Sequence, residues 1–233
     1  MTMIERLSLF TTLDGIAAGF LFLTWFAIGW RIEHPSSKHP SVTILMSNYR
    51  HVWMREFVTR EPRIFDSQIL ASLRQGTSFF ASTSLLAIGG LLALLGNPEP
   101  LETAAQDFTQ RQLPVFVLQM KLLAPAVLVG NAFLKFVWAN RIFGYCAVMM
   151  AAVPNDIDDP QAFPRADQAA ALNVRAAINF NRGLRSLYFA LCALTWLMGP
   201  IMLILGVAIT TYVLWSREFM SVPREIILRE TKI

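Results

Sequence analysis

The sequence predicts an all-α membrane protein with four transmembrane helices, and this prediction rests on composition and on the spacing of the charges. Of the 233 residues, 55% are hydrophobic and 15% are charged, whereas globular proteins typically have about 25% charged residues. The charges are separated by four apolar runs, each long enough to cross the roughly 30 Å hydrocarbon core of a bilayer as a helix. The runs cover residues 9–30, 78–95, 113–138 and 187–215 of a single helical membrane domain over residues 1–233.

The first run, residues 9–30, is expected to be a retained span and not a cleaved secretory signal. Glu5 and Asp14 interrupt the positively charged start that a signal needs. The apolar stretch is also long for the core of a signal peptide.

The fourth run, residues 187–215, is free of charge and longer than one crossing requires. Gly199 and Pro200 lie in its middle. Because glycine and proline bend helices that still cross the membrane, we expect one tilted or kinked helix here.

The distribution of lysine and arginine predicts the orientation. Basic residues are concentrated between the first and second runs and between the third and fourth, while Arg111 is alone between the second and third. Basic loops stay on the cytoplasmic side. We therefore expect an inner (plasma) membrane protein with both long loops cytoplasmic and both termini outward. The basic tail conflicts with this orientation, since it carries Arg217, Arg224, Arg229 and Lys232.

The two cytoplasmic segments, residues 42–77 and 139–186, are predicted to be helical extensions of the spans. In residues 44–58 the apolar residues recur at helical spacing with arginines between them, which indicates an amphipathic helix.

The order of span, helical segment and span occurs twice, which suggests a parallel two-fold internal repeat. One register of this repeat pairs Gly76 with Gly183 and also pairs Asp14 with Lys121.

Short motifs in both cytoplasmic segments resemble those of a known family. They are SNYR at 47–50, FDSQI at 65–69, SLRQG at 72–76 and FNRGLRSLYF at 180–189. With them the chain resembles an uncharacterised family of bacterial and plant membrane proteins, domain-of-unknown-function family 599. The resemblance covers nearly the whole chain and implies a multi-pass topology, but it implies no activity.

Asp14 and Lys121 lie inside predicted spans, where a charge costs about 2.5–3.5 kcal/mol at mid-membrane. Their similar depths in the first and third spans permit an interhelical ion pair. We favour a structural role, or snorkelling to the interface, over proton or ion handling, because no further carboxylate or histidine continues a relay. If the pair exists, Asp14→Asn and Lys121→Met should each destabilise the fold, and a charge swap should restore it.

Other residues in the spans are candidate polar or kinked positions, namely Pro125, Asn131 and Pro200. Broken helices can form binding elements, but we favour kinks whose freed carbonyls are satisfied by neighbouring helices. Gly15 and Gly19 form a GxxxG step, for which we favour packing within the bundle over homodimerisation.

Several arginines at the membrane ends of the cytoplasmic segments are candidate contacts for anionic lipid headgroups, at about 1 kcal/mol each. Simple topology signals explain them equally well. The candidates are Arg50, Arg55, Arg74, Arg182 and Arg185.

The sequence contains no catalytic motif, neither a glycine-rich phosphate loop nor a GxSxG elbow. His34, His39 and His51 have no cysteine or clustered carboxylate nearby, so no metal site is predicted. We expect no enzyme activity, no cofactor and no nucleic-acid binding.

These features favour a structural, assembly or accessory component of a membrane complex, whose partners are the lipid bilayer and another membrane protein or a second copy of the chain. The alternative is a small oligomeric transporter or channel component that uses Asp14 and Lys121.

Overall fold

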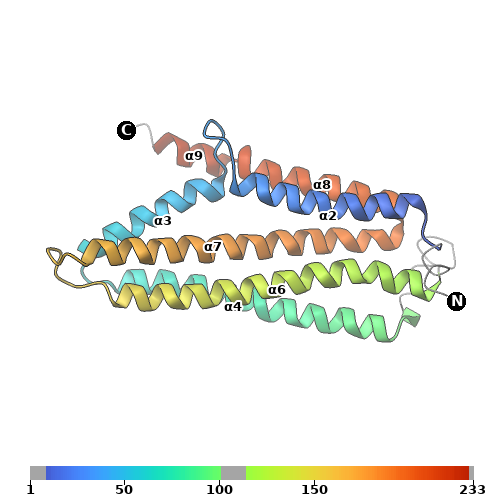
Figure 1. The fold of residues 1–233 in the computed structure, drawn as a ribbon, viewed down its shortest axis with the longest axis horizontal. Coiled ribbons are helices and arrows are strands. Elements are labelled where there is room, and N and C mark those ends of the chain that lie inside the picture. The colour runs from blue at the N-terminus through green and yellow to red at the C-terminus, as the bar shows by residue number, and fades with distance from the viewer. Residues whose placement is uncertain (1–8, 101–113, 231–233) are drawn as a thin grey trace. The chain divides into compact units, whose positions relative to one another are not determined.

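The computed structural model describes residues 9–100 and 114–230, and in these ranges all the regular elements are helices (Figure 1). They are α2 (Thr12–Glu33), α3 (Val42–Thr59), α4 (Ile64–Gly96), α6 (Val115–Ala151), α7 (Ala162–Ala193), the 3₁₀-helix η1 (Leu194–Met198), α8 (Pro200–Phe219) and α9 (Val222–Glu230). The all-α prediction is therefore confirmed. Arg111, Lys232 and the start of the third apolar run at residue 113 lie outside the described residues.

Among the described residues, four segments are long and apolar enough to cross a membrane, the number that the sequence predicts, although the fourth begins at Pro200 and not at residue 187. They are Thr12–Glu33, Ile64–Gly96, Val115–Ala151 and Pro200–Arg229. Helices α4 and α6 continue well beyond their apolar runs into the segments 42–77 and 139–186, as expected from the helical character of those segments.

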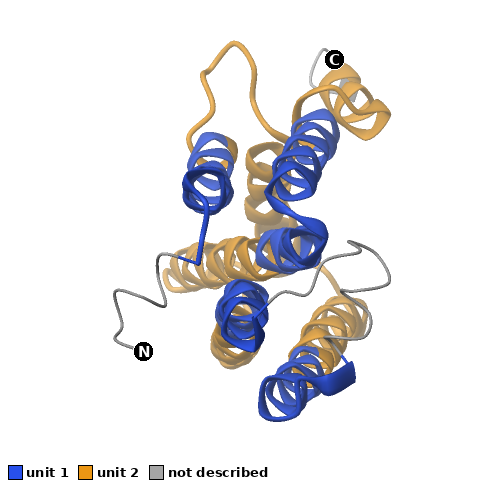
Figure 2. Cartoon of the chain, turned by 90° about the vertical axis from the view of Figure 1, so that its right-hand side faces the viewer, with its two compact units in different colours: residues 1–31, 84–132, 184–217 blue, residues 32–83, 133–183, 218–233 orange. Residues whose placement is uncertain are grey.

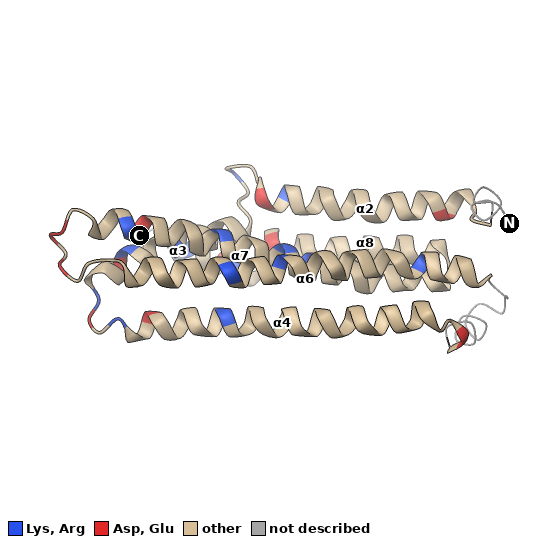
Figure 3. Ribbon diagram, turned by 60° about the horizontal axis from the view of Figure 1, so that its bottom comes forward, with Lys and Arg blue, Asp and Glu red and all other residues tan. Residues whose placement is uncertain are grey.

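The chain divides into two compact units, and the long helices contribute residues to both (Figure 2). Unit 1 consists of residues 1–31, 84–132 and 184–217, and unit 2 consists of residues 32–83, 133–183 and 218–233. Figure 3 shows long uncharged stretches in α2, α4, α6 and α8. The charged residues in the described part of unit 1 are Asp14, Arg31, Glu99, Lys121, Arg185 and Arg217.

This distribution of charge makes unit 1 the part of the chain that is suited to lipid. Transfer of an unpaired charge into hydrocarbon costs several kcal/mol. Unit 2 is less suited to lipid, because it holds most of the arginines and carboxylates in the chain.

Residues 187–215 form a helical hairpin in place of the single kinked helix that the sequence suggested. Gly199 has a φ of 123°, which favours glycine and ends the helical path. Pro200 then occupies the first position of α8, where its missing N–H and fixed φ are tolerated. A kink would require only one lost hydrogen bond, but this backbone conformation reverses the chain.

Contacts on the two sides of the turn show that α7 and α8 are antiparallel within unit 1. The hydroxyl of Thr195 donates to the carbonyl of Met202 at 3.1 Å. Farther from the turn, a Cβ added to Gly206 would lie 3.1 Å from Cys192 Sγ, so a side chain at this position would crowd α7. Farther still, Arg217 donates to the hydroxyl of Tyr188 at 3.1 Å.

Unit 2 has an apolar core formed by residues of α3, α4, α6 and α7. It includes Met54, Phe57, Leu70, Phe143 and Cys146. The contribution of α7 is a row of buried alanines at helical spacing, Ala162, Ala166, Ala169, Ala170 and Ala176. Small residues on one helix face let α7 pack close to its neighbours.

The C-terminal segment belongs to unit 2 because it binds the start of α3. The Glu218 carboxylate accepts the backbone N–H of Thr43 at 3.0 Å and the Thr43 hydroxyl at 2.9 Å. Arg224 donates to the carbonyl of Pro40 at 2.9 Å. These bonds hold the C-terminal tail beside residues 40–43. The orientation expected from the sequence places the tail outside and residues 40–43 on the cytoplasmic side, so that a membrane would separate them.

The aromatic rings of Phe80, Phe136 and Phe180 join α4, α6 and α7 in unit 2, with ring centroids 5.4–5.6 Å apart. Gly183 lies against this cluster, and a Cβ on it would be 2.6 Å from Cε1 of Phe136. A Cβ on Gly76 would have no neighbour within 4 Å.

We therefore expect Gly183→Ala to destabilise the protein by about 1–3 kcal/mol through overpacking. Gly76→Ala, the matched control, should be neutral or stabilising, because alanine is the better helix former by about 1 kcal/mol. Thermal unfolding of the purified variants in detergent measures both effects. Equal unfolding temperatures for the two variants would contradict the packing of Gly183 on Phe136.

Candidate functional site

The candidate site in unit 1 begins at the N-terminus of α2, where Thr11 and Asp14 form a capping box. The Thr11 hydroxyl accepts the backbone N–H of Asp14 at 3.2 Å. In return, Asp14 Oδ2 accepts the backbone N–H of Thr11 at 3.1 Å and the Thr11 hydroxyl at 2.6 Å. A carboxylate at this position satisfies exposed N–H groups and interacts favourably with the helix dipole. Asp14 therefore lies in the first turn of α2, nearer the helix end than the apolar run suggested.

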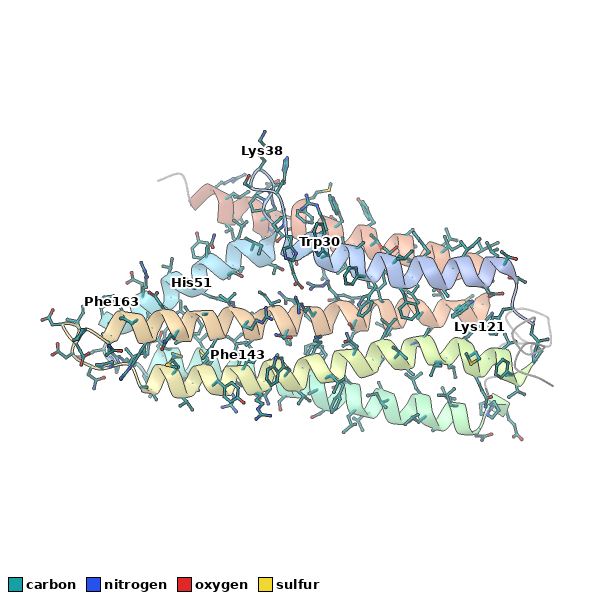
Figure 4. All side chains as sticks on the ribbon, viewed as in Figure 1. Trp30, Lys38, His51, Lys121, Phe143 and Phe163 are labelled. Atoms are coloured by element: carbon teal, nitrogen blue, oxygen red, sulfur yellow. The ribbon has the colours of Figure 1, made fainter. Side chains whose placement is uncertain are left out.

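The second oxygen of Asp14 contacts residues from two other elements of unit 1. Trp196 of η1 donates its indole N–H to Asp14 Oδ1 at 2.8 Å. Lys121 of α6, which is labelled in Figure 4, places Nζ 3.7 Å from the same oxygen. Lys121 Nζ also lies 5.9 Å from the centroid of the Trp196 ring, within range of a cation–π interaction.

Three of the four side chains of this site are buried, and Thr11 is exposed. Lys121 is 4% exposed, and Asp14 and Trp196 are each 7% exposed. The distance between Lys121 and Asp14 exceeds that of an ordinary hydrogen bond, so their attraction is mainly coulombic. The structure thus brings together the two charges that the sequence singled out, and it connects α2, α6 and η1 through them.

The chemistry of the site is that of a satisfied ion pair. The Asp14 carboxylate has N–H and O–H donors on both oxygens, and these donors stabilise its charged form. Trp196 donates a hydrogen bond but cannot accept a proton, so it cannot pass protons onward. Within residues 9–100 and 114–230 no group of three His, Cys, Asp or Glu is placed to hold a metal ion.

The other polar candidates in the spans have separate roles. Asn131 donates to the hydroxyl of Ser186 at 2.7 Å and so links α6 to α7 in unit 1. It is about 15 Å along α6 from Lys121, at 1.5 Å per residue. Pro125 lies inside α6, which continues past it as one helix. Pro200 begins α8.

Two of the headgroup candidates bind protein partners on α7. Arg50 donates to the side-chain carbonyl of Asn173, which is fully buried. Burial lowers the pKa of Arg50. Arg55 forms an exposed ion pair with Asp167 at 3.2 Å.

The remaining headgroup candidates differ in their surroundings. Arg182 donates to the Glu33 carboxylate at 2.8 Å, and this hydrogen bond raises the pKa of Arg182. Arg185 is buried, with Nε 3.7 Å from where a Cβ on Gly29 would lie. Arg74 is exposed and borders a pocket.

Sequence reasoning missed two residues of the site, Thr11 and Trp196. The spacing of Thr11 and Asp14 before an apolar run is a capping-box signal that could have identified the first. Nothing near Trp196 in the sequence marks it, because only the reversal after η1 brings the indole to Asp14.

We expect Asp14→Asn to cost about 3 kcal/mol of unfolding free energy, because it leaves Lys121 buried without a counter-charge. Lys121→Met should cost less, since Thr11 and Trp196 still donate to the Asp14 carboxylate. The double variant should be more stable than the sum of the single losses predicts, with a coupling of about 1–3 kcal/mol. A charge swap should fail, because a lysine at position 14 cannot accept the capping hydrogen bonds.

Thermal unfolding in detergent tests this cycle, with Lys135→Met on the same helix as the control. Strictly additive effects of the two single substitutions would show that the charges do not interact.

Comparison with known proteins places the chain in a family. A family model described as protein of unknown function, DUF599, matches residues 16–223, which include Lys121 and Trp196 and begin just after Asp14. No curated protein and no solved structure matches the chain. Because the match covers most of the chain, the protein belongs to the DUF599 family.

Proposed function

We propose that the protein is a non-catalytic, membrane-embedded subunit that assembles with another membrane-spanning helix through α4. The observation that carries this proposal is the exposure of α4, which contacts α6 in unit 1 mainly through Leu91, Leu94 and Leu95. In its apolar stretch 6% of the residues are buried inside the protein, against 44% in α6. Most of the α4 surface is therefore open to lipid or to a partner.

The small residues on α4 support a partner helix. Ser82, Gly89, Gly90 and Ala93 are all exposed, and a Cβ on either glycine would meet nothing within 4 Å. Glycine in a helix costs about 1 kcal/mol relative to alanine. Packing within this chain does not require glycine at these positions, whereas close approach of a second helix would.

Helix α2 also has exposed glycines with open space around them. Gly15 and Gly19, for which we expected packing within the bundle, are exposed, and a Cβ on either of them would also meet nothing within 4 Å. The GxxxG step on α2 is therefore a second surface at which another spanning helix can approach closely.

The alternative function, a small oligomeric transporter or channel component, draws on Asp14 and Lys121. Both groups are buried, and each has a protein partner. Asn131, the third polar residue considered for such a path, binds Ser186 instead. These contacts favour a structural role for the three residues over a path for ions. We therefore place the transporter or channel function second.

We further propose that the protein lies in the inner membrane with unit 2 on the cytoplasmic side and the N-terminus outward. Most basic residues of both long loops fall in unit 2, with Arg31 and Arg185 at the adjoining ends of unit 1, and basic loops remain cytoplasmic. The hydrogen bonds from Thr43 to Glu218 and from Arg224 to Pro40 support a cytoplasmic C-terminus as well. This revises the expectation that both termini face outward, and it gives the basic tail its usual location.

The hairpin supports the same revision if residues 184–198 form a fifth crossing beside the four apolar segments, and we propose that they do. Residues 184–198 of α7 and η1 extend roughly 25 Å at the rises of these helices, and they belong to unit 1 with α8. Five crossings would leave the two termini on opposite sides of the membrane.

We expect a photo-crosslinking residue, p-benzoylphenylalanine, to form protein adducts in native membranes when it replaces Ser82. The same residue in place of Ile209, which is exposed on α8, is the control and should yield little protein adduct. Gly89→Ile should reduce the Ser82 adduct about tenfold, equivalent to about 1.4 kcal/mol, while the unfolding temperature of the purified protein stays unchanged.

Gel shifts and mass spectrometry identify the adducts, including those with a second copy of the chain. Absence of a protein adduct from position 82, or an adduct yield that Gly89→Ile leaves unchanged, would rule out assembly through α4.

A further inference from the structure

Unit 2 contains a pocket of about 350 Å³ between α3, α4 and α6, separate from the Asp14 site. Its floor is apolar and includes Leu70, Ala147 and Met150. Its polar lining consists of Arg63, Ser67, Arg74 and Asn155. The volume lies at the lower end of the range found for small-molecule sites, about 300–1,000 Å³.

The lining of the pocket is positively charged. Two arginines line it, and none of the described residues around it is a carboxylate. Arg63 is held in place by the carbonyls of Val58, Val153 and Pro154 at 2.9–3.0 Å, and it stacks on Phe57 at 4.7 Å. These bonds fix its position, but no counter-ion among the pocket's lining residues neutralises its charge.

Arg74 differs from the other arginines of unit 2 considered above. Arg55 and Arg182 bind carboxylates, and the others bind an asparagine side chain or backbone carbonyls. The side chain of Arg74 has no hydrogen bond or ion pair to another described residue. Its Nη2 lies 4.0 Å from where a Cβ on Gly144 would be, one helical turn from Ala147 in the pocket floor. The guanidinium of Arg74 therefore lies beside α6, at ordinary van der Waals distance from position 144.

We propose that this pocket binds an amphiphilic anion, with a phosphate or carboxylate head on Arg74 and an apolar body against Leu70, Ala147 and Met150. A guanidinium is a typical donor to such heads. The apolar floor would favour a ligand with an aliphatic chain over a bare ion. The ligand can be a membrane lipid or a soluble anion of the same chemistry.

Calorimetric titration of the full-length protein in an uncharged detergent tests the site, with hexyl phosphate, inorganic phosphate and hexanol as probes. Hexyl phosphate should bind saturably and at least about tenfold more tightly than either of the other two probes. Arg74→Gln should weaken this binding about tenfold or more. Arg55→Gln removes an arginine that does not line the pocket, and it should bind hexyl phosphate like the unmodified protein.

Native mass spectrometry of protein extracted from membranes distinguishes the two sources. Retention of an anionic phospholipid by the unmodified protein and its loss in Arg74→Gln identify a lipid ligand, whereas hexyl phosphate binding without retained lipid identifies a soluble one. The proposal is overturned if hexyl phosphate does not bind saturably, if inorganic phosphate binds equally well, or if Arg74→Gln binds like Arg55→Gln.

Discussion

Charge is disfavoured in hydrocarbon, and the organisation of this protein follows from that constraint. An unpaired ionised side chain in the bilayer core costs several kcal/mol, so helices that cross it can carry charge only at their ends or in pairs. Unit 1 follows this rule with long uncharged stretches and one buried pair, Asp14 with Lys121. Unit 2, which holds most of the charge, uses arginines to bind carboxylates and backbone carbonyls between helices.

The buried pair is stabilised by the turn that follows α7. Gly199 and Pro200 reverse the chain. Trp196, which donates a hydrogen bond to Asp14, lies three residues before this reversal. The carboxylate thereby caps α2, accepts the indole N–H and attracts Lys121. Asp14 thus interacts with three elements of unit 1, which explains how its charge is accommodated there.

Glycines divide into two groups according to what surrounds them. Gly183 and Gly206 lie where a Cβ would collide with a neighbouring side chain, so packing inside the chain requires them. Gly15, Gly19, Gly89 and Gly90 have open space around them in the described part of the chain, as the proposed approach of a second helix requires. This contrast links the packing of the bundle to the proposed assembly.

Much of the helical architecture could be predicted from apolar runs, because α2, α4 and α6 are defined by local composition. The hairpin could not, since an apolar run with glycine and proline in its middle fits both a kink and a reversal. The φ of Gly199 decides between them, and it is not encoded in hydropathy.

Within the candidate site, the proximity of Asp14 and Lys121 could be anticipated from their matching depths. The part played by Trp196 could not, because it depends on the reversal. The partners of Arg50, Arg55 and Arg182 likewise come from distant segments, so their sequence neighbours suggested only a basic surface.

The central proposal is that unit 1 crosses the membrane while the charged part of unit 2, including the C-terminal tail, stays on the cytoplasmic side. Labelling of single cysteines with a membrane-impermeant maleimide tests it directly, because the native Cys146 and Cys192 are buried. In intact cells Asn97→Cys, after α4, should be labelled, whereas Val52→Cys and Ile226→Cys should react only after permeabilisation. Labelling of Ile226→Cys in intact cells would contradict the account.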